Sequence, residues 1–363
     1  MGEFDKLKEQ LKELTDMSAP SGFEDPMIEY MSEKISSYGV KSEVDPLGNV
    51  LAHLGDSSGK PKIMIMAHMD EVGLVVRKIE PDGFLRIERI GGVTVVILPG
   101  CRVLVKTRNG NLIKGVIGSK SHHLTPVSER DEAVPVDQLY IDIGCFNKEE
   151  VLSLGVEVGS PVVYTRGFIQ RGPVVFAPAI DDRGGCLILL QLIERLSGKK
   201  FNPEIFIVGT VQEEYSLRGV LPAARMLNPD FAIAVDCAIS SDTPDLEKSD
   251  IKLGGGPAIY AYSFHGRGTL GGVIPNPKLR KLIEDASSKA GISTQTCVVY
   301  GCLTDASFVQ LEGKGIPSIE LGFPTRYLHT TLEVCHLGDI EQLIKLLEIF
   351  ILNLPSDVDL SRY

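Results

Sequence analysis

The stretch KIMIMAHMDE, residues 62–71, changes character halfway along. Its first part is a continuous apolar run from Ile63 to Ala67, which is typical of a strand that is buried on both faces of a sheet. The run stops at His68, and Asp70 and Glu71 follow almost at once. Such an ending has an ordinary explanation, a sheet that reaches the surface, and a functional one, a site at the carboxyl end of the strand.

Helical and strand patterns alternate on both sides of this strand. Amphipathic helices are predicted over residues 3–16 and 24–38, with the APSG turn between them, and a strand or hairpin over 41–54. Beyond residue 177, helices are predicted at 181–196, 217–226, 276–290 and 337–352, and strands at 206–211, 231–236 and 316–322. This alternation is typical of an α/β sheet with helices packed on its faces.

Residues 72–164 have a different texture. Short alternating segments such as GLVVRKI, CRVLVKT and SPVVYT are punctuated by Gly and Pro, and helical patterns are scarce. This pattern predicts a small all-β unit. We therefore predict an α/β domain built from residues 1–70 and 165–363, interrupted by a barrel-like β domain at residues 71–164.

The composition limits the class of protein. The 363 residues are 43% hydrophobic and 23% charged, and no segment approaches the roughly 18 consecutive apolar residues of a membrane-spanning helix. The formal net charge of −11 argues against nucleic-acid or anionic-membrane partners. The N-terminus, MGEFDKLKEQLKEL, lacks the apolar core of a secretion signal, and the seven cysteines form no CxxC pair. We therefore expect a cytoplasmic protein without a disulfide framework.

Polar residues recur where the apolar runs of the α/β domain stop. They are two histidines and several carboxylates, namely His68, Asp70, Asp181, Asp182, Glu213, Glu214, Asp236 and His329. Each has an ordinary explanation when taken alone: Asp181 could cap a helix, and Asp236 could end a strand in a turn. Because ligands of open α/β sheets bind at the carboxyl ends of the strands, their recurrence at one edge favours a functional site.

The chemistry of this set favours divalent metal ions. Imidazole and carboxylate ligands without a thiolate suit zinc, cobalt or manganese. Two divalent ions carry four positive charges, which three ligand carboxylates and one hydroxide neutralise. One carboxylate must then bridge the ions, which would lie ~3.5–4 Å apart. A further carboxylate is left for proton transfer.

Five motifs of the chain resemble the glutamyl aminopeptidase family of dinuclear metallopeptidases, which includes the tetrahedral (TET) aminopeptidases. They occur in the order found in that family: AHMDEVG (67–73), PAIDDRGG (178–185), VQEEYSLRG (211–219), AVDCA (234–238) and PTRYLHT (324–330). The resemblance covers nearly the whole chain, including the inserted β domain. It implies a phosphorylase/hydrolase-like catalytic domain with a mixed sheet, and an enzyme that removes N-terminal residues from peptides.

The resemblance also implies a role for each motif residue. The ligands of two divalent ions, zinc or cobalt in the first place and manganese otherwise, would be His68, Asp181, Glu214, Asp236 and His329. Asp181 would bridge both ions and precede a cis peptide bond to Asp182. Asp70 would orient the His68 ring from behind. Glu213 would be the general base that generates a metal-bridged hydroxide, and the acid that protonates the leaving amine.

The resemblance implies a homo-oligomer, because family members form dimers through the inserted domain and often tetrahedral dodecamers. Thr304 and Asp305 are expected near the N-terminus of a bound peptide, and the His122–His123 pair in a loop or interface. An amidase or deacylase acting on small N-acyl compounds through the same metal centre is an alternative. Glycoside hydrolysis is disfavoured, since the chain has no Trp and only 6% aromatic residues to form sugar platforms.

Overall fold

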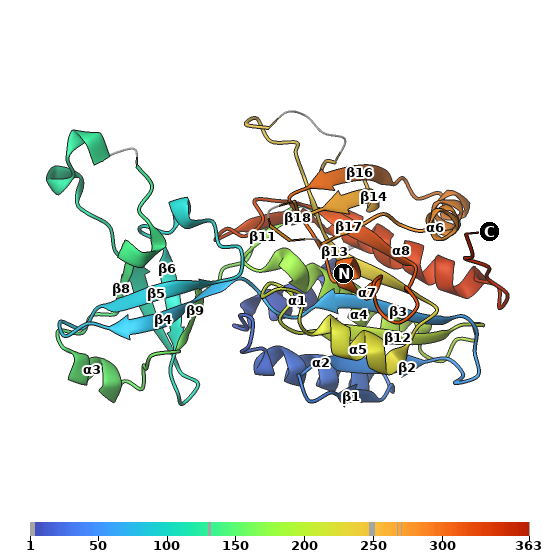
Figure 1. The fold of residues 1–363 in the computed structure, drawn as a ribbon, viewed down its shortest axis with the longest axis horizontal. Helices are drawn as coiled ribbons and strands as arrows, with labels where there is room; N and C mark the ends of the chain where they lie inside the picture. The colour runs from blue at the N-terminus through green and yellow to red at the C-terminus, as the bar shows by residue number, and fades with distance from the viewer. Residues whose placement is uncertain (1–3, 130–131, 247–250, 267, 270, 363) are drawn as a thin grey trace.

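The computed structural model describes residues 4–129, 132–246, 251–266, 268–269 and 271–362 (Figure 1). The chain forms a mixed α/β sheet flanked by helices and a closed antiparallel β-barrel that projects from it. The barrel follows the strand that contains residues 62–68, so the predicted mixed-sheet α/β fold with an inserted barrel is confirmed. Among the described residues, no helix combines the length and the apolar content needed to cross a bilayer.

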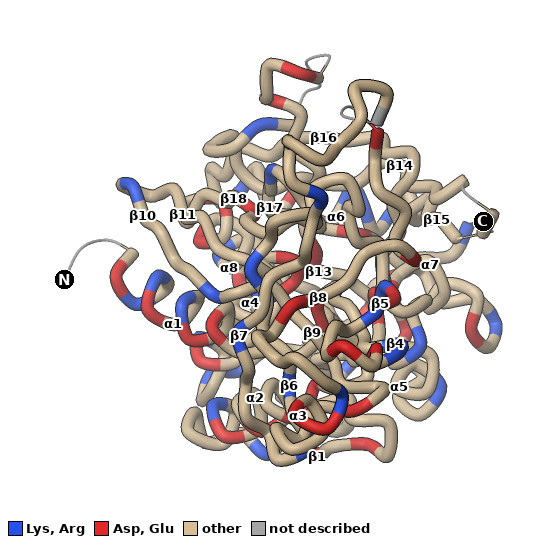
Figure 2. The backbone as a smooth tube through the Cα atoms, turned by 90° about the vertical axis from the view of Figure 1, so that its left-hand side faces the viewer, with Lys and Arg blue, Asp and Glu red and all other residues tan. Residues whose placement is uncertain are grey.

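The part before the barrel comprises α1 (Asp5–Asp16), α2 (Asp25–Ser37), β1 (Ser42–Val44), β2 (Val50–Leu54) and β3 (Lys62–His68). Residue 3, the predicted start of the first helix, lies outside the described residues. In α1, the apolar residues Leu7, Leu11 and Leu14 recur at helical spacing and are buried, whereas the intervening positions, apart from the buried Gln10, are charged. Figure 2 shows acidic and basic positions interspersed along α1 and over the barrel.

The barrel closes in the order β4-β5-β8-β7-β6-β9, and every pairing in it is antiparallel. Its elements are β4 (Gly73–Ile79), β5 (Leu85–Ile90), β6 (Arg102–Lys106), β7 (Leu112–Ile117), β8 (Tyr140–Asp142), α3 (Lys148–Ser153) and β9 (Pro161–Tyr164). Alternate strand residues such as Val103 and Val105 point inward and form a core of their own. The barrel therefore has a core that is separate from that of the sheet.

The part after the barrel contains most of the sheet and its covering helices. Its elements are β10 (Ile169–Arg171), β11 (Val174–Ala177), α4 (Ile180–Leu196), β12 (Glu204–Thr210), α5 (Val220–Leu227), β13 (Phe231–Ile239), β14 (Ala258–Phe264), β15 (Gly272–Val273), α6 (Pro277–Ala290), β16 (Gln295–Tyr300), α7 (Ala306–Val309), β17 (Ser318–Arg326), β18 (Glu333–His336) and α8 (Leu337–Asn353). The predicted helix at 217–226 begins later, at Val220, because Ser216 and Leu217 adopt positive φ angles of 72° and 55°.

The centre of the sheet is parallel. Strands β12, β3, β13 and β17 are adjacent and run in the same direction, while antiparallel strands lie outside them. Strand β3 is covered on both faces: Ile63 and Ile65 pack into the core that contains α4 and α8, and Met64 and Met66 pack under α5. This two-sided burial explains why its sequence is a continuous apolar run.

Candidate active site

The register of the parallel strands brings the predicted residues to one edge. His68 is the last residue of β3 and pairs with Thr210, the last residue of β12. In the neighbouring pair, Ala234 of β13 lies opposite Met66, so Asp236 lies at the level of His68. Parallel strands end at the same edge, and the chain segments that follow them meet there.

Asp181 lies between two imidazole rings. Its Oδ1 is 3.1 Å from Nε2 of His68, and its Oδ2 is 3.5 Å from Nε2 of His329. Nε2 of His329 is also 3.0 Å from Oε1 of Glu214. The ligand atoms of His68, Asp181 and Glu214 all lie within 4.8 Å of one another, which is compatible with coordination of one or two cations.

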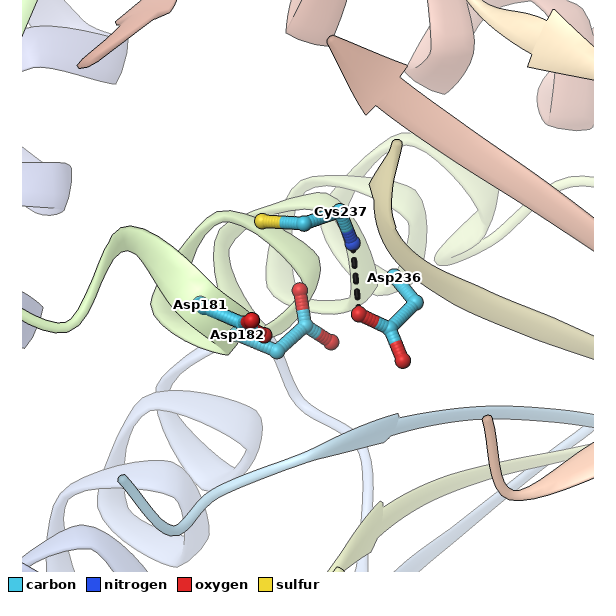
Figure 3. A group of neighbouring side chains, drawn as sticks. All are labelled: Asp181, Asp182, Asp236 and Cys237. Atoms are coloured by element: carbon cyan, nitrogen blue, oxygen red, sulfur yellow. Dashed lines mark hydrogen bonds between the residues drawn. The ribbon is translucent and has the colours of Figure 1, made fainter. Parts of the chain in front are cut away.

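A second group of ligand atoms adjoins the first. The donor atoms of Asp181, Asp182, Asp236 and Cys237 also lie within 4.8 Å of one another, between the start of α4 and strand β13 (Figure 3). The Asp181–Asp182 peptide bond is cis. Oδ1 of Asp182 accepts from the Gly185 amide at 2.9 Å, whereas its buried Oδ2 has no hydrogen-bond partner among the described residues.

Both histidines are oriented through their Nδ1 atoms. Nδ1 of His68 is 3.2 Å from the carbonyl oxygen of Asp70, and Nδ1 of His329 is 3.0 Å from that of Gly92. A carbonyl only accepts hydrogen bonds, so each Nδ1 carries a proton. Burial lowers the pKa of both rings, but the carboxylates beside Nε2 outweigh it and raise both pKa values well above the ordinary value, so each Nε2 also donates a proton to them. A cation bound at Nε2 would take the place of that second proton.

The loop after β12 places two consecutive glutamates at one site. Neighbouring strand residues point to opposite faces, so the chain must leave strand geometry for Glu213 and Glu214 to serve one site. It does so: β12 ends at Thr210, and Gln212 has a φ of 55°. The Asp70 carboxylate accepts from the backbone amides of both glutamates, each at 3.0 Å. Oε2 of Glu213 then lies 4.0 Å from Nε2 of His68.

The electrostatics of the group fit bound cations. Burial raises the pKa values of Asp182, Glu213 and Asp236 well above their ordinary values, and repulsion between neighbouring carboxylates adds to the effect. Burial acts the same way on Asp181, but hydrogen bonds from His329 and His68 lower its pKa below the ordinary value. Divalent cations would offset the repulsion, replace the Nε2 protons of the two histidines and give Oδ2 of Asp182 a partner, so these residues fit a dinuclear centre.

One buried carboxylate at this site had no signal in the sequence. Glu333, at the start of β18, accepts from the amide of His329 at 2.7 Å and from the amide of Asp181 at 2.9 Å. Burial and the charge of Asp181 raise the pKa of Glu333 to about 8. It fixes the backbones of two candidate ligands relative to each other, and only the folded chain reveals the contact.

The candidate ligands open into a cavity of about 650 Å³. Beyond them, its wall is mixed: it includes apolar side chains such as Ile239, Leu303 and Phe308, and polar ones such as Thr243, Asp245 and His265. Thr304 and Asp305 are buried behind this wall, where Asp305 accepts from the Thr210 hydroxyl at 2.6 Å. His122 and His123 are exposed between β7 and β8, in the inserted barrel.

Comparisons with known proteins agree with this geometry. The family model of the M42 glutamyl aminopeptidases matches residues 48–346. Putative aminopeptidase SgcX of Escherichia coli is 38% identical over 346 residues, which are 94% of this chain and 92% of that protein. The structure is similar to aminopeptidase APDkam598 from Desulfurococcus kamchatkensis, with a TM-score of 0.90, 38% identity and coverage of 96% and 95% of the two chains.

A second solved structure is Pyrococcus horikoshii TET1 peptidase, described as able to assemble into a tetrahedron or a large octahedral shell. It has a TM-score of 0.85 and 33% identity, with coverage of 95% of this chain and 99% of that one. The family model spans far more than half of the chain, and the resemblance inferred from the five motifs is confirmed. The chain therefore belongs to the M42 glutamyl aminopeptidase family and is a metallo-aminopeptidase.

Proposed function

We propose that this aminopeptidase hydrolyses the first peptide bond of its substrates at a dinuclear centre held by His68, Asp181, Glu214, Asp236 and His329. The observation that supports it best is the position of Asp181, whose two oxygens each face a different imidazole Nε2. A carboxylate in that position can bridge two ions. When bound, the ions would supply Lewis acidity toward the scissile carbonyl and lower the pKa of a water molecule.

Glu213 moves the proton in this proposal. It is not needed as a ligand, and its carboxylate lies beside His68 at the wall of the cavity. It accepts a proton from the attacking water and donates it to the leaving amine. Asp70 supports this step in two ways. Its carbonyl oxygen orients the His68 ring, and its carboxylate accepts hydrogen bonds from the amides of Glu213 and Glu214.

The acidic ligand cluster also selects the substrate. A free α-amino group has a nitrogen lone pair and N–H donors to offer the loaded centre and its carboxylates, whereas the nitrogen lone pair of an N-acylated substrate is delocalised into its carbonyl. We therefore propose peptides with a free N-terminus as substrates, with Thr304 and Asp305 shaping the cavity wall from behind. The amidase or deacylase alternative predicts the opposite preference on the same centre.

We further propose that residues 71–164 form a dimerisation domain and that dimers build a larger shell; the Pyrococcus horikoshii relative is described as able to assemble into a tetrahedron or a large octahedral shell. Large apolar side chains lie exposed on this domain, including Val96, Leu124, Val127 and Phe146. Exposed apolar groups of this size commonly mark contacts between subunits. Light scattering of the purified chain tests this, and a monomer at micromolar concentration would contradict it.

The test of the function compares wild type, Glu213→Gln and the matched control Glu29→Gln, which changes an exposed glutamate of α2. Each protein is assayed for bound metal and for cleavage of aminoacyl amides with free or blocked amines. We expect about two metal ions per chain in all three proteins. Loss of the general base should reduce kcat by about 10²–10⁴-fold in Glu213→Gln alone. Equal cleavage of N-acylated substrates would instead support the deacylase.

A further inference from the structure

The turn between α1 and α2 reaches the back of the active site. Ser21 donates its hydroxyl hydrogen to Oδ2 of Asp70 at 2.6 Å. Three residues later, Oε1 of Glu24 accepts from the amide of Gln212 at 3.0 Å and from the amide of Gly22 at 2.8 Å. Ser21 and Glu24 are both 5% exposed. The turn is therefore a buried part of the site, although it lies far from it in the sequence.

Two carboxylates at this point accept hydrogen bonds from three consecutive backbone amides. Glu24 accepts from residue 212, and Asp70 accepts from residues 213 and 214. Successive amides of a strand point in opposite directions, so three can converge only where the backbone leaves strand geometry. The φ of 55° at Gln212 provides that departure. A left-handed conformation is unfavourable for a non-glycine residue, and it persists because its surroundings hold it.

We propose that Glu24 is a positioning residue of the active site, whose carboxylate holds the Gln212 amide and thereby aims Glu213 and Glu214 at the metal site. The inference rests on the roles proposed above for those two glutamates. Without this acceptor, the left-handed turn at residue 212 loses its partner and relaxes. Glu213 then no longer points at the reacting water, and Glu214 moves away from His329.

The position of Glu24 in the fold does not by itself explain its burial. It precedes α2 as the N-cap residue, but its side chain forms no capping hydrogen bond to that helix. It forms no ion pair with the described lysines and arginines. Its carboxylate is directed at the 212–214 loop instead. Burial of a carboxylate costs free energy of folding. A role at the site therefore explains the burial of Glu24 better than a role in the helix does.

Two substitutions separate an acceptor role from a charge effect. Glu24→Gln keeps the length of the side chain and an acceptor oxygen but removes the charge. Glu24→Asp keeps the charge but withdraws the oxygen by one methylene, about 1.5 Å, beyond hydrogen-bonding distance of the Gln212 amide. Glu29→Gln, on the exposed face of α2, is the matched control.

The measurements are kcat and KM on a free aminoacyl amide, the affinity for Zn²⁺ or Co²⁺ by competition with a chelator, and the melting temperature. We expect Glu24→Asp to lose about 10–100-fold in kcat with KM changed less than about 3-fold, as for a misplaced catalytic group. Its affinity for the more weakly bound ion should fall by about 10–100-fold, because Glu214 is displaced. Glu24→Gln should stay within about 3-fold of wild type in both quantities, as should the control.

Each other pattern would overturn the inference. If Glu24→Gln loses activity and Glu24→Asp keeps it, the charge matters and the acceptor does not. If both variants match wild type in kcat and metal affinity, the 212–214 loop is held without Glu24. If the wild-type chain cleaves no aminoacyl amide, the proposed function fails, and the metal affinities of the two variants still decide whether Glu24 positions the loop.

Discussion

Glu320 provides a quantitative test of the electrostatics behind the cavity wall. This β17 residue is 1% exposed, and its Oε1 accepts from the hydroxyls of Ser263 at 3.0 Å and Thr304 at 2.8 Å. Its Oε2 has no partner among the described residues. Burial raises the pKa of Glu320 from an ordinary 4.5 to about 7. As the pH rises, the unfolded chain therefore loses the proton of Glu320 before the folded protein does.

The sign of the effect on stability follows from linkage. Between pH 4.5 and 7 the folded state binds more protons at Glu320 than the unfolded state, so the free energy of unfolding decreases as the pH rises. The shift from 4.5 to about 7, at ~1.36 kcal/mol per unit, amounts to roughly 3 kcal/mol once both states are ionised. Glu320→Gln mimics the protonated side chain and removes this loss.

The assay is the melting temperature of metal-saturated wild type and Glu320→Gln from pH 5 to pH 8.5. At roughly 2.1 cal/mol/K per residue, the unfolding entropy of 363 residues is about 0.8 kcal/mol/K, so 3 kcal/mol corresponds to about 4 °C. We expect the variant to melt only about 1 °C higher near pH 5, where the unfolded Glu320 is already partly ionised, and about 4 °C higher at pH 8.5. Every other titrating group is common to both proteins. A difference that is the same at both pH values, or a variant that melts lower at pH 8.5, would refute the reasoning.

Two further predictions concern the metal site and the junction with the barrel. Removal of metal by a chelator should abolish activity and lower the melting temperature. Each ion present at 1,000 times its dissociation constant stabilises the fold by ~4 kcal/mol. An unchanged melting temperature would show that metal binding does not stabilise the folded state. Glu71 is 2% exposed and accepts from Arg166 at 2.8 Å and from Arg183 at 3.3 Å. Glu71→Gln should cost about 3–5 kcal/mol in chemical unfolding, because the buried guanidinium of Arg183 and the partly buried one of Arg166 lose their counter-charge. Arg166→Met should cost less, because Glu71 keeps Arg183 as a partner.

The sequence predicts the parallel core and the edge where the site lies, because both follow from local patterns. A strand buried on two faces appears as an apolar run, and the first polar residue after it lies at the carboxyl end. For this reason the local patterns alone are sufficient to place His68 and Asp236 at one edge. The alternation of short segments between residues 72 and 164 predicts the barrel for the same reason, since each strand has one buried and one exposed face.

The residues that support the site were not predictable, because their function depends on contacts across long stretches of chain. Glu333 lies 152 residues from Asp181, whose amide it binds, and Glu24 lies 188 residues from Gln212. Nothing in the local sequence distinguishes these glutamates from surface ones. The APSG segment was predicted correctly as a turn, but a turn pattern does not reveal what the turn packs against.

The inserted barrel is coupled to the catalytic centre by more than the chain connection. Gly92, after the barrel strand β5, supplies the carbonyl that accepts from Nδ1 of His329. A Cβ atom at this position would lie 2.8 Å from the same Nδ1, so a larger residue would displace the ring that it now orients. The ion pair between Glu71 and Arg166 joins the segments that enter and leave the barrel. The position of the barrel and the orientation of the His329 ring are thus linked, because the segment after β5 supplies the acceptor that orients this candidate metal ligand.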